Sequence, residues 1–158
     1  MSYKNERLIE FNRFLNGKKV AIIGLGVSNL PLLEYMYDKK ANVTIFDEKD
    51  EEKANQEALT KVKEYRFKTF FGKDSLTNLK GFDIIFRSPS CLPTRPELVM
   101  EEERGAIVTT EIEMLMKLSP AKIIGITGSD GKTTTTSLIY SILKKAGYNT
   151  YLGGNIGI

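Results

Sequence analysis

The stretch VAIIGLGVSN, at residues 20–29, decides the fold of the first part of the chain. Its four apolar residues predict a buried strand, and Gly24 and Gly26 predict a tight turn into a helix with Ser28 as its N-cap. The spacing matches the dinucleotide fingerprint G-x-G-x-x-G except at Asn29, and Asp47 is the acidic residue expected about twenty positions later. This pattern predicts a ligand with a diphosphate and a ribose at the helix N-terminus near Ser28. The alternative is a turn whose glycines serve packing alone.

Short apolar segments alternate with helical patterns over residues 1–109. We expect strands at residues 18–23, 42–46, 67–71, 83–86 and 106–109, and helices at residues 6–16, 28–40, 51–64 and 96–103. Because strands and helices alternate and the strands are apolar throughout, the sequence predicts βαβ units and a parallel sheet covered on both faces. The predicted fold class is α/β, with a Rossmann-like parallel-sheet domain at residues 1–109.

A second glycine-rich turn lies within IIGITGSDGKTTT, at residues 123–135. We expect a strand at residues 121–127, then a glycine turn, then a helix at residues 132–146. Such a turn holds a nucleotide triphosphate, because backbone N–H groups and Lys132 can contact phosphates while the Thr133 hydroxyl ligates Mg²⁺. The pattern is shorter than the general phosphate loop, since Ile126 stands where the first glycine is usual. The alternative is a strand–turn–helix junction with an exposed lysine.

The remaining segments of this part are an expected helix at residues 111–118 and an expected strand at residues 148–152. A phosphate-loop domain needs several more strands and a further carboxylate for Mg²⁺. We therefore expect residues 110–158 to be the truncated beginning of a P-loop ATP-binding α/β domain, and the chain to be the front part of a larger enzyme. A lone βαβ unit packed on the first domain is the alternative.

Composition excludes several classes of protein. The net charge of +3, with scattered lysines, does not favour nucleic acid as a partner. No apolar run is long enough to span a bilayer, and the N-terminus has no secretory pattern. A single cysteine, Cys91, and the absence of histidine exclude disulfides, zinc clusters and imidazole catalysis. We expect a cytoplasmic protein, without membrane insertion, that relies on lysines, carboxylates, backbone amides or Mg²⁺.

Several motifs together resemble the Mur family of bacterial cell-wall amide ligases. They are, in chain order, IIGLG at 22–26, IFD at 45–47, SP at 88–89, EIE at 111–113, IGITGSDGKTTT at 124–135 and GGNIG at 153–157. The resemblance implies a first domain that binds the UDP end of a precursor, a second that binds ATP, and a third that is absent here. The closing GGNIG points to the family member that adds D-glutamate to UDP-N-acetylmuramoyl-L-alanine, a step of peptidoglycan synthesis that serves cell-wall biogenesis, cell shape and cell division.

The resemblance also implies two sets of site residues. The UDP-substrate set is Gly26, Val27, Ser28, Asp47, Glu48, Lys49, Ser88 and Asn155. The ATP set is Gly128, Ser129, Asp130, Gly131, Lys132, Thr133 and Thr134, of which Lys132 and Thr133 are catalytic and Thr133 ligates Mg²⁺. Three residues depart from the family pattern: Ser90 replaces a usual glycine, Asp130 an asparagine, and Glu48 a small hydroxyl residue.

The implied reaction is amide formation through an acyl phosphate, with UDP-N-acetylmuramoyl-L-alanine and D-glutamate as substrates and ATP and Mg²⁺ as cofactors. The remainder of the ligase chain is the expected partner, and the 158 residues are expected to be inactive alone. The sequence leaves two other functions open. One is an NAD-binding Rossmann dehydrogenase, and the other is a nucleotide-sensing switch module.

Overall fold

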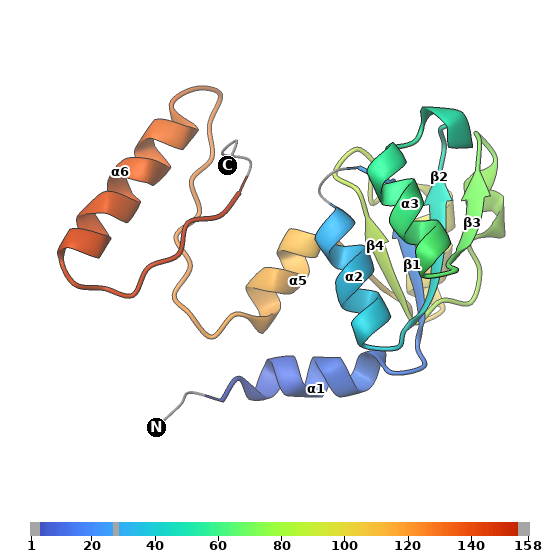
Figure 1. The fold of residues 1–158 in the computed structure, drawn as a ribbon, viewed down its shortest axis with the longest axis horizontal. Coiled ribbons are helices and arrows are strands. Elements are labelled where there is room, and N and C mark those ends of the chain that lie inside the picture. Colours follow the sequence, from blue (N-terminus) through green and yellow to red (C-terminus); the bar gives the residue numbers. More distant parts are fainter. Residues whose placement is uncertain (1–3, 27–28, 155–158) are drawn as a thin grey trace. The chain divides into compact units, whose positions relative to one another are not determined.

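A computed structural model describes residues 4–26 and 29–154 of the chain (Figure 1). The chain divides into two compact units, Met1–Pro120 and Ala121–Ile158, which we call the first and the second unit. The predicted domain division between residues 109 and 110 stays a prediction.

The first unit is built on a five-stranded sheet in the order β3-β2-β1-β4-β5. Every neighbouring pair of strands is parallel. The predicted Rossmann-like parallel sheet is therefore confirmed, and each strand lies within about one residue of its expected range. The strands are β1 (Lys19–Ile23), β2 (Asn42–Asp47), β3 (Lys68–Phe71), β4 (Ile84–Arg87) and β5 (Ile107–Thr109).

Helices connect the strands and cover both faces of the sheet. One face packs against hydrophobic side chains of α1 (Glu6–Leu15), α2 (Leu30–Asp38), α3 (Gln56–Glu64) and α5 (Glu111–Leu118). The other face packs against α4 (Pro96–Glu103) and the 3₁₀ turn Ser75–Asn78. In Figure 1, α2 and α3 lie together against one side of the strands. Since side chains alternate along a strand, Ile22 belongs to the first face and Ala21 to the second, and both are fully buried.

The helix expected at residues 51–64 is wrong in its first part. A 3₁₀ turn covers Glu51–Lys53, and α3 begins only at Gln56. Asn55 is the reason, because its side chain accepts a hydrogen bond from the backbone N–H of Ala58 and so caps a new helix. Ala54 between the two elements has extended backbone and a buried side chain.

A buried carboxylate, that of Glu101, stabilises a turn of the first unit. Glu101 of α4 is 1% exposed, and its carboxylate accepts hydrogen bonds from the backbone N–H groups of Gly81 and Phe82 at 2.6 and 3.2 Å. Arg104 also donates to it. Burial alone would raise the pKa of this carboxyl, but these donors outweigh burial and hold the pKa below its usual value. Glu101 therefore stays ionised and fixes the turn that leads into β4.

The second unit contains α6 (Lys132–Lys145), close to the expected helix. The strands expected at residues 121–127 and 148–152 are wrong, since the described residues 121–154 contain no strand. Ile123 and Ile124 are 46% and 55% exposed. A strand needs a neighbour to pair its backbone groups, and no strand within the described part of this unit supplies one.

Candidate functional site

The candidate site of the first unit lies at the carboxyl ends of the parallel strands. From β1 the sheet continues to β2 and β3 on one side and to β4 and β5 on the other. This point, where the strand order reverses, is where ligands bind in open α/β sheets. The segments that leave β1, β2 and β4 at this edge contain most of the residues predicted to bind the UDP substrate.

The turn after β1 needs a glycine at position 24. Gly24 has φ of +89°, and a Cβ there would lie only 3.1 Å from Cβ of Ser88. Its N–H donates to the carbonyl of Phe46 at 2.7 Å, which ties the turn to β2. Gly26 does not have a positive φ, and no atom of the described residues lies within 4 Å of the place that a Cβ would take.

Asn29, which replaces the third glycine of the fingerprint, closes this turn. It is 9% exposed, and its side-chain amide donates a hydrogen bond to the carbonyl of Gly24. This bond was not predicted, because the fingerprint treats the position as a site for a small residue. Val27 and Ser28, two residues predicted to bind the diphosphate, lie outside the described residues.

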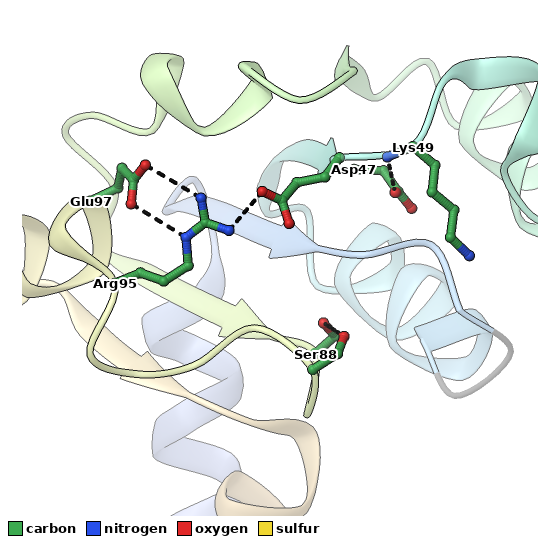
Figure 2. Close-up of polar contacts among 7 residues, drawn as sticks. Asp47, Lys49, Ser88, Arg95 and Glu97 are labelled. Carbon is green, nitrogen blue, oxygen red and sulfur yellow. Dashed lines mark hydrogen bonds and ion pairs between the residues drawn. The ribbon is translucent and has the colours of Figure 1, made fainter.

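Asp47 joins the turn after β1 to the turn after β2. It is 8% exposed, and its two carboxylate oxygens accept hydrogen bonds from the N–H groups of Leu25 and Lys49, at 2.8 and 2.9 Å. Figure 2 shows the bond to Lys49. Asp47 was predicted as a substrate-binding residue. Its contacts in the structure hold two backbone segments of the site in place, and its binding role stays a prediction.

Glu48 meets an arginine that the sequence reasoning missed. Nη1 of Arg95, at the start of α4, lies 2.6 Å from Oε1 of Glu48. The same guanidinium faces Glu97, with Nε 3.4 Å from one carboxylate oxygen (Figure 2). The hydrogen bond to Glu48 raises the pKa of Arg95 most, and the hydrogen bonds to Glu97 raise it further. The only sequence signal was the position of Arg95 in the loop after a predicted strand.

The segment after β4 is folded tightly around Ser88. The N–H of Ser88 donates to the carbonyl of Ile23 at 3.0 Å, and its hydroxyl lies 3.1 Å from that of Ser90. Arg87 donates from Nη1 to the carbonyl of Cys91 at 3.2 Å, and its Nη2 lies 3.5 Å from Glu113. Cys91 is buried, and burial raises the pKa of its thiol, which favours a packing role.

The candidate phosphate loop of the second unit closes on itself through Lys132. Gly131 is the N-cap of α6 in the left-handed conformation, with φ of +70°, and no atom of the described chain lies within 4 Å of where a Cβ would stand. Nζ of Lys132 donates to the carbonyls of Gly128 and Ser129, the latter at 2.9 Å. The ammonium therefore already lies beside the loop backbone. Thr133 and Thr134 are exposed in the first turn of α6, and Asp130 is exposed in the loop.

Two further observations concern metals and membranes. Within residues 4–26 and 29–154, no group of three or more cysteine, aspartate or glutamate side chains could hold a metal ion. The role of Thr133 as a Mg²⁺ ligand stays a prediction, and Asn155 lies outside the described residues. No helix in the described chain has the length and apolar character needed to cross a membrane.

Comparisons with known proteins match both units. Residues 18–110 match the family described as Mur ligase MurD-like, N-terminal domain, and residues 126–157 match the Mur ligase middle domain. The UDP-N-acetylmuramoylalanine–D-glutamate ligase of Clostridium novyi is 49% identical over 148 residues, which are 94% of this chain and 32% of that protein. The ligase of the same name from Acetivibrio thermocellus is 47% identical over 154 residues, which are 98% of this chain and 33% of that protein.

The chain thus spans about a third of the length of these relatives. Among solved structures, a dipicolinate synthase chain from Bacillus halodurans aligns with a TM-score of 0.50 at 16% identity, covering 78% of this chain and 45% of that one. This likeness shows the fold alone. The match over residues 18–110, together with the site at the carboxyl edge of the sheet, shows that the chain belongs to the Mur ligase family.

Proposed function

We propose that the protein is an ATP-dependent ligase that adds D-glutamate to UDP-N-acetylmuramoyl-L-alanine during peptidoglycan precursor synthesis in the cytoplasm. The observation that carries this proposal is the order of the two family matches, a MurD-like N-terminal domain followed by a Mur ligase middle domain. The relatives that bear the name of this activity are close to 50% identical over nearly the whole chain.

The first unit binds the UDP end of the substrate in this proposal. Gly26, Val27 and Ser28 face the diphosphate, because N–H groups at a glycine turn and a helix N-terminus attract anions. Asp47, Glu48 and Lys49 border the uridine, Ser88 lies at the same edge of the sheet, and Asn155 is a further residue that the family resemblance assigns to the precursor. The bonds that Asp47 makes to Leu25 and Lys49 support a preformed site, since they hold the turns after β1 and β2 together before a ligand arrives.

The second unit binds ATP, and the residues present fit that role. The loop Gly128–Thr134 offers glycine-permitted turns, backbone N–H groups and one lysine in the order that phosphate binding requires. Lys132 leaves the carbonyls of Gly128 and Ser129 to neutralise charge on the β- and γ-phosphates. Thr133 ligates Mg²⁺, and Thr134 donates a hydrogen bond to a phosphate oxygen.

The work of the protein is positioning and charge stabilisation. ATP supplies the phosphoryl group that turns the carboxylate of the L-alanyl residue into an acyl phosphate, which the amine of D-glutamate then attacks. Holding these groups in line replaces encounters in solution by reaction within one complex. The further Mg²⁺ ligands and the amino-acid site belong to the remainder of the ligase chain, so we expect the 158 residues to form no adduct alone.

Replacing Lys132 by alanine in the full-length protein tests this function. We expect ADP release that depends on UDP-N-acetylmuramoyl-L-alanine to fall by at least about a hundredfold, because the phosphates lose their fixed positive charge. UDP binding to the first unit should be unchanged. Lys122→Ala, which removes an exposed lysine in the same unit, is the matched control and should keep normal activity. Normal ADP release by the Lys132→Ala variant would contradict the proposal.

A titration with UDP and with NADH separates this function from a Rossmann dehydrogenase. The ligase function requires UDP to bind more tightly than NADH. Tighter binding of NADH would favour the dehydrogenase. Release of ADP in the absence of any UDP-linked substrate would favour a nucleotide-sensing switch.

A further inference from the structure

Arg95 connects two segments of the crevice that are far apart in sequence. Glu48 directly follows β2, whereas Arg95 ends the segment that follows β4. Because β1 lies between β2 and β4, these two segments leave the sheet about 10 Å apart, on either side of the glycine turn. The ion pair of 2.6 Å therefore joins segments on either side of β1, at the edge where ligands bind in open α/β sheets.

Both ends of this connection rest on fixed backbone. Asp47 holds the segment after β2 through the N–H of Lys49. On the other side, Arg87 holds the carbonyl of Cys91, and Pro96 at the start of α4 restricts the backbone beside Arg95. The pair therefore joins two held segments of backbone, although its side chains, 30% and 48% exposed, contribute little to stability themselves.

The charges around Arg95 leave one free acceptor. Both oxygens of Glu97 face the guanidinium, at 3.4 and 3.5 Å, but only Oε1 of Glu48 does. Among the contacts of the described residues, Oε2 of Glu48 has no partner. A carboxylate oxygen only accepts hydrogen bonds, so this oxygen suits a group with N–H or O–H donors, as a nucleoside has, and does not suit a phosphate.

We propose, resting on the proposed function, that Arg95 is a positioning residue for the nucleoside end of the substrate. It holds Glu48 by one oxygen, so that the other oxygen accepts a hydrogen bond from the nucleoside. It also keeps the segments after β2 and β4 at a fixed separation across the crevice. Arg95 itself takes no part in phosphoryl transfer or amide formation.

The test is a set of variants in the full-length protein, with the KM of each substrate measured separately. For Arg95→Gln we expect the KM of the UDP-linked substrate and the Kd of UDP to rise about tenfold, with kcat and the KM of ATP within about twofold of wild type. Glu48→Gln should give a similar rise. The double variant should be no worse than the worse single one, because both changes remove the same interaction. Arg95→Lys should be intermediate, since an ammonium can pair with Glu48 without also spanning Glu97.

Lys18→Gln is the matched control. Lys18 pairs with Asp83 at 2.9 Å, with side chains 40% and 33% exposed, close to the 30% and 48% of Arg95 and Glu48. This pair lies at the opposite edge of the sheet, where β1 and β4 begin. Its loss should leave the KM of the UDP-linked substrate within about twofold of wild type.

Four results would overturn the inference. They are an unchanged KM in Arg95→Gln, an equal rise in the KM of ATP, additive effects in the double variant, and an equal rise in Lys18→Gln. A wild-type protein that binds no UDP would overturn the proposed function, and this inference with it. Normal UDP use by wild type and by Arg95→Gln would overturn this inference alone.

Discussion

Each unit contains an Ile-Ile-Gly segment before a glycine turn, and the two segments have different structures. In the first unit Ile22-Ile23-Gly24 includes the end of β1, and both isoleucines are at most 4% exposed. In the second unit Ile123-Ile124-Gly125 forms no strand, and its isoleucines are about half exposed. The first segment has β2 and β4 as neighbours, whereas the described second unit has no strand to offer. An apolar run before a glycine turn therefore predicts a strand only where other strands are present to pair with it.

The largest expected effect comes from truncating the corresponding isoleucine in each unit. Ile22→Ala should lower the free energy of unfolding by about 4 kcal/mol, because it leaves a cavity in a core where Ile22 is fully buried. Ile123→Ala should change it by no more than about 0.5 kcal/mol. Urea denaturation of the two variants, followed by circular dichroism, measures both values. Equal losses would mean that the two segments have the same environment.

Removal of the buried carboxylate in α4 should cause the second-largest loss of stability. Glu101→Ala leaves the N–H groups of Gly81 and Phe82 without their acceptor, and we expect a loss of about 3 kcal/mol. Glu102→Ala, which changes the exposed neighbour, is the control and should stay within about 0.5 kcal/mol. Similar losses in the two variants would show that the bonds to Glu101 do not brace the turn before β4.

Glu101 also gives the first unit a defined response to acid. Its pKa in the folded state lies below the value it has when unfolded. Its contribution to stability is therefore fully present above the unfolded pKa and is lost as pH falls through the folded pKa. Between neutral pH and pH values below about 4, wild type should lose more stability than Glu101→Gln, as chemical denaturation at each pH can show. Parallel pH profiles of the two proteins would contradict the lowered pKa.

Replacing the two glycines of the turn after β1 by alanine should lower stability by different amounts, although the fingerprint treats both positions alike. Gly24→Ala should cost about 2 kcal/mol, because its φ of +89° is strained for alanine and the new methyl approaches Ser88. Gly26→Ala should cost no more than about 0.5 kcal/mol, since no atom of the described residues lies within 4 Å of the place of the new methyl. Thermal unfolding of both variants provides the comparison. A larger loss of stability in Gly26→Ala than in Gly24→Ala would contradict the steric constraint assigned to Gly24.

The smallest effect is expected at a helix cap. Thr110 accepts a hydrogen bond from the N–H of Glu113, and the Glu113 carboxylate accepts one from the N–H of Thr110. Thr110→Ala should therefore cost about 1 kcal/mol. Thr133→Ala, in the exposed first turn of α6, should have no measurable effect on the unfolding of the first unit. Equal effects of the two changes in a urea titration would argue against the capping bonds.

These contrasts show how much of the fold could be predicted. The five strands of the first unit were predictable because short, wholly apolar segments alternate with helical ones. The break before α3 was not, since it depends on one Asn55 cap within a charged helical pattern. The missing strands of the second unit were mispredicted because local apolarity says nothing about available neighbours.

The candidate site shows the same limit. Glycine turns and the acidic residue at the end of β2 follow from short sequence patterns. The contacts that hold the candidate site together join residues distant in sequence, such as Arg95 with Glu48 and Arg87 with Glu113. No local pattern links such pairs, and only the strand order brings them together.

The most direct test of the account is amide formation by the full-length protein. With UDP-N-acetylmuramoyl-L-alanine, ATP, Mg²⁺ and D-glutamate, mass spectrometry should detect the D-glutamate adduct, with one ADP released for each adduct formed. Without D-glutamate, or with L-glutamate in its place, no adduct should accumulate. Failure to form the adduct under these conditions, by a protein that binds both nucleotides, would contradict the account.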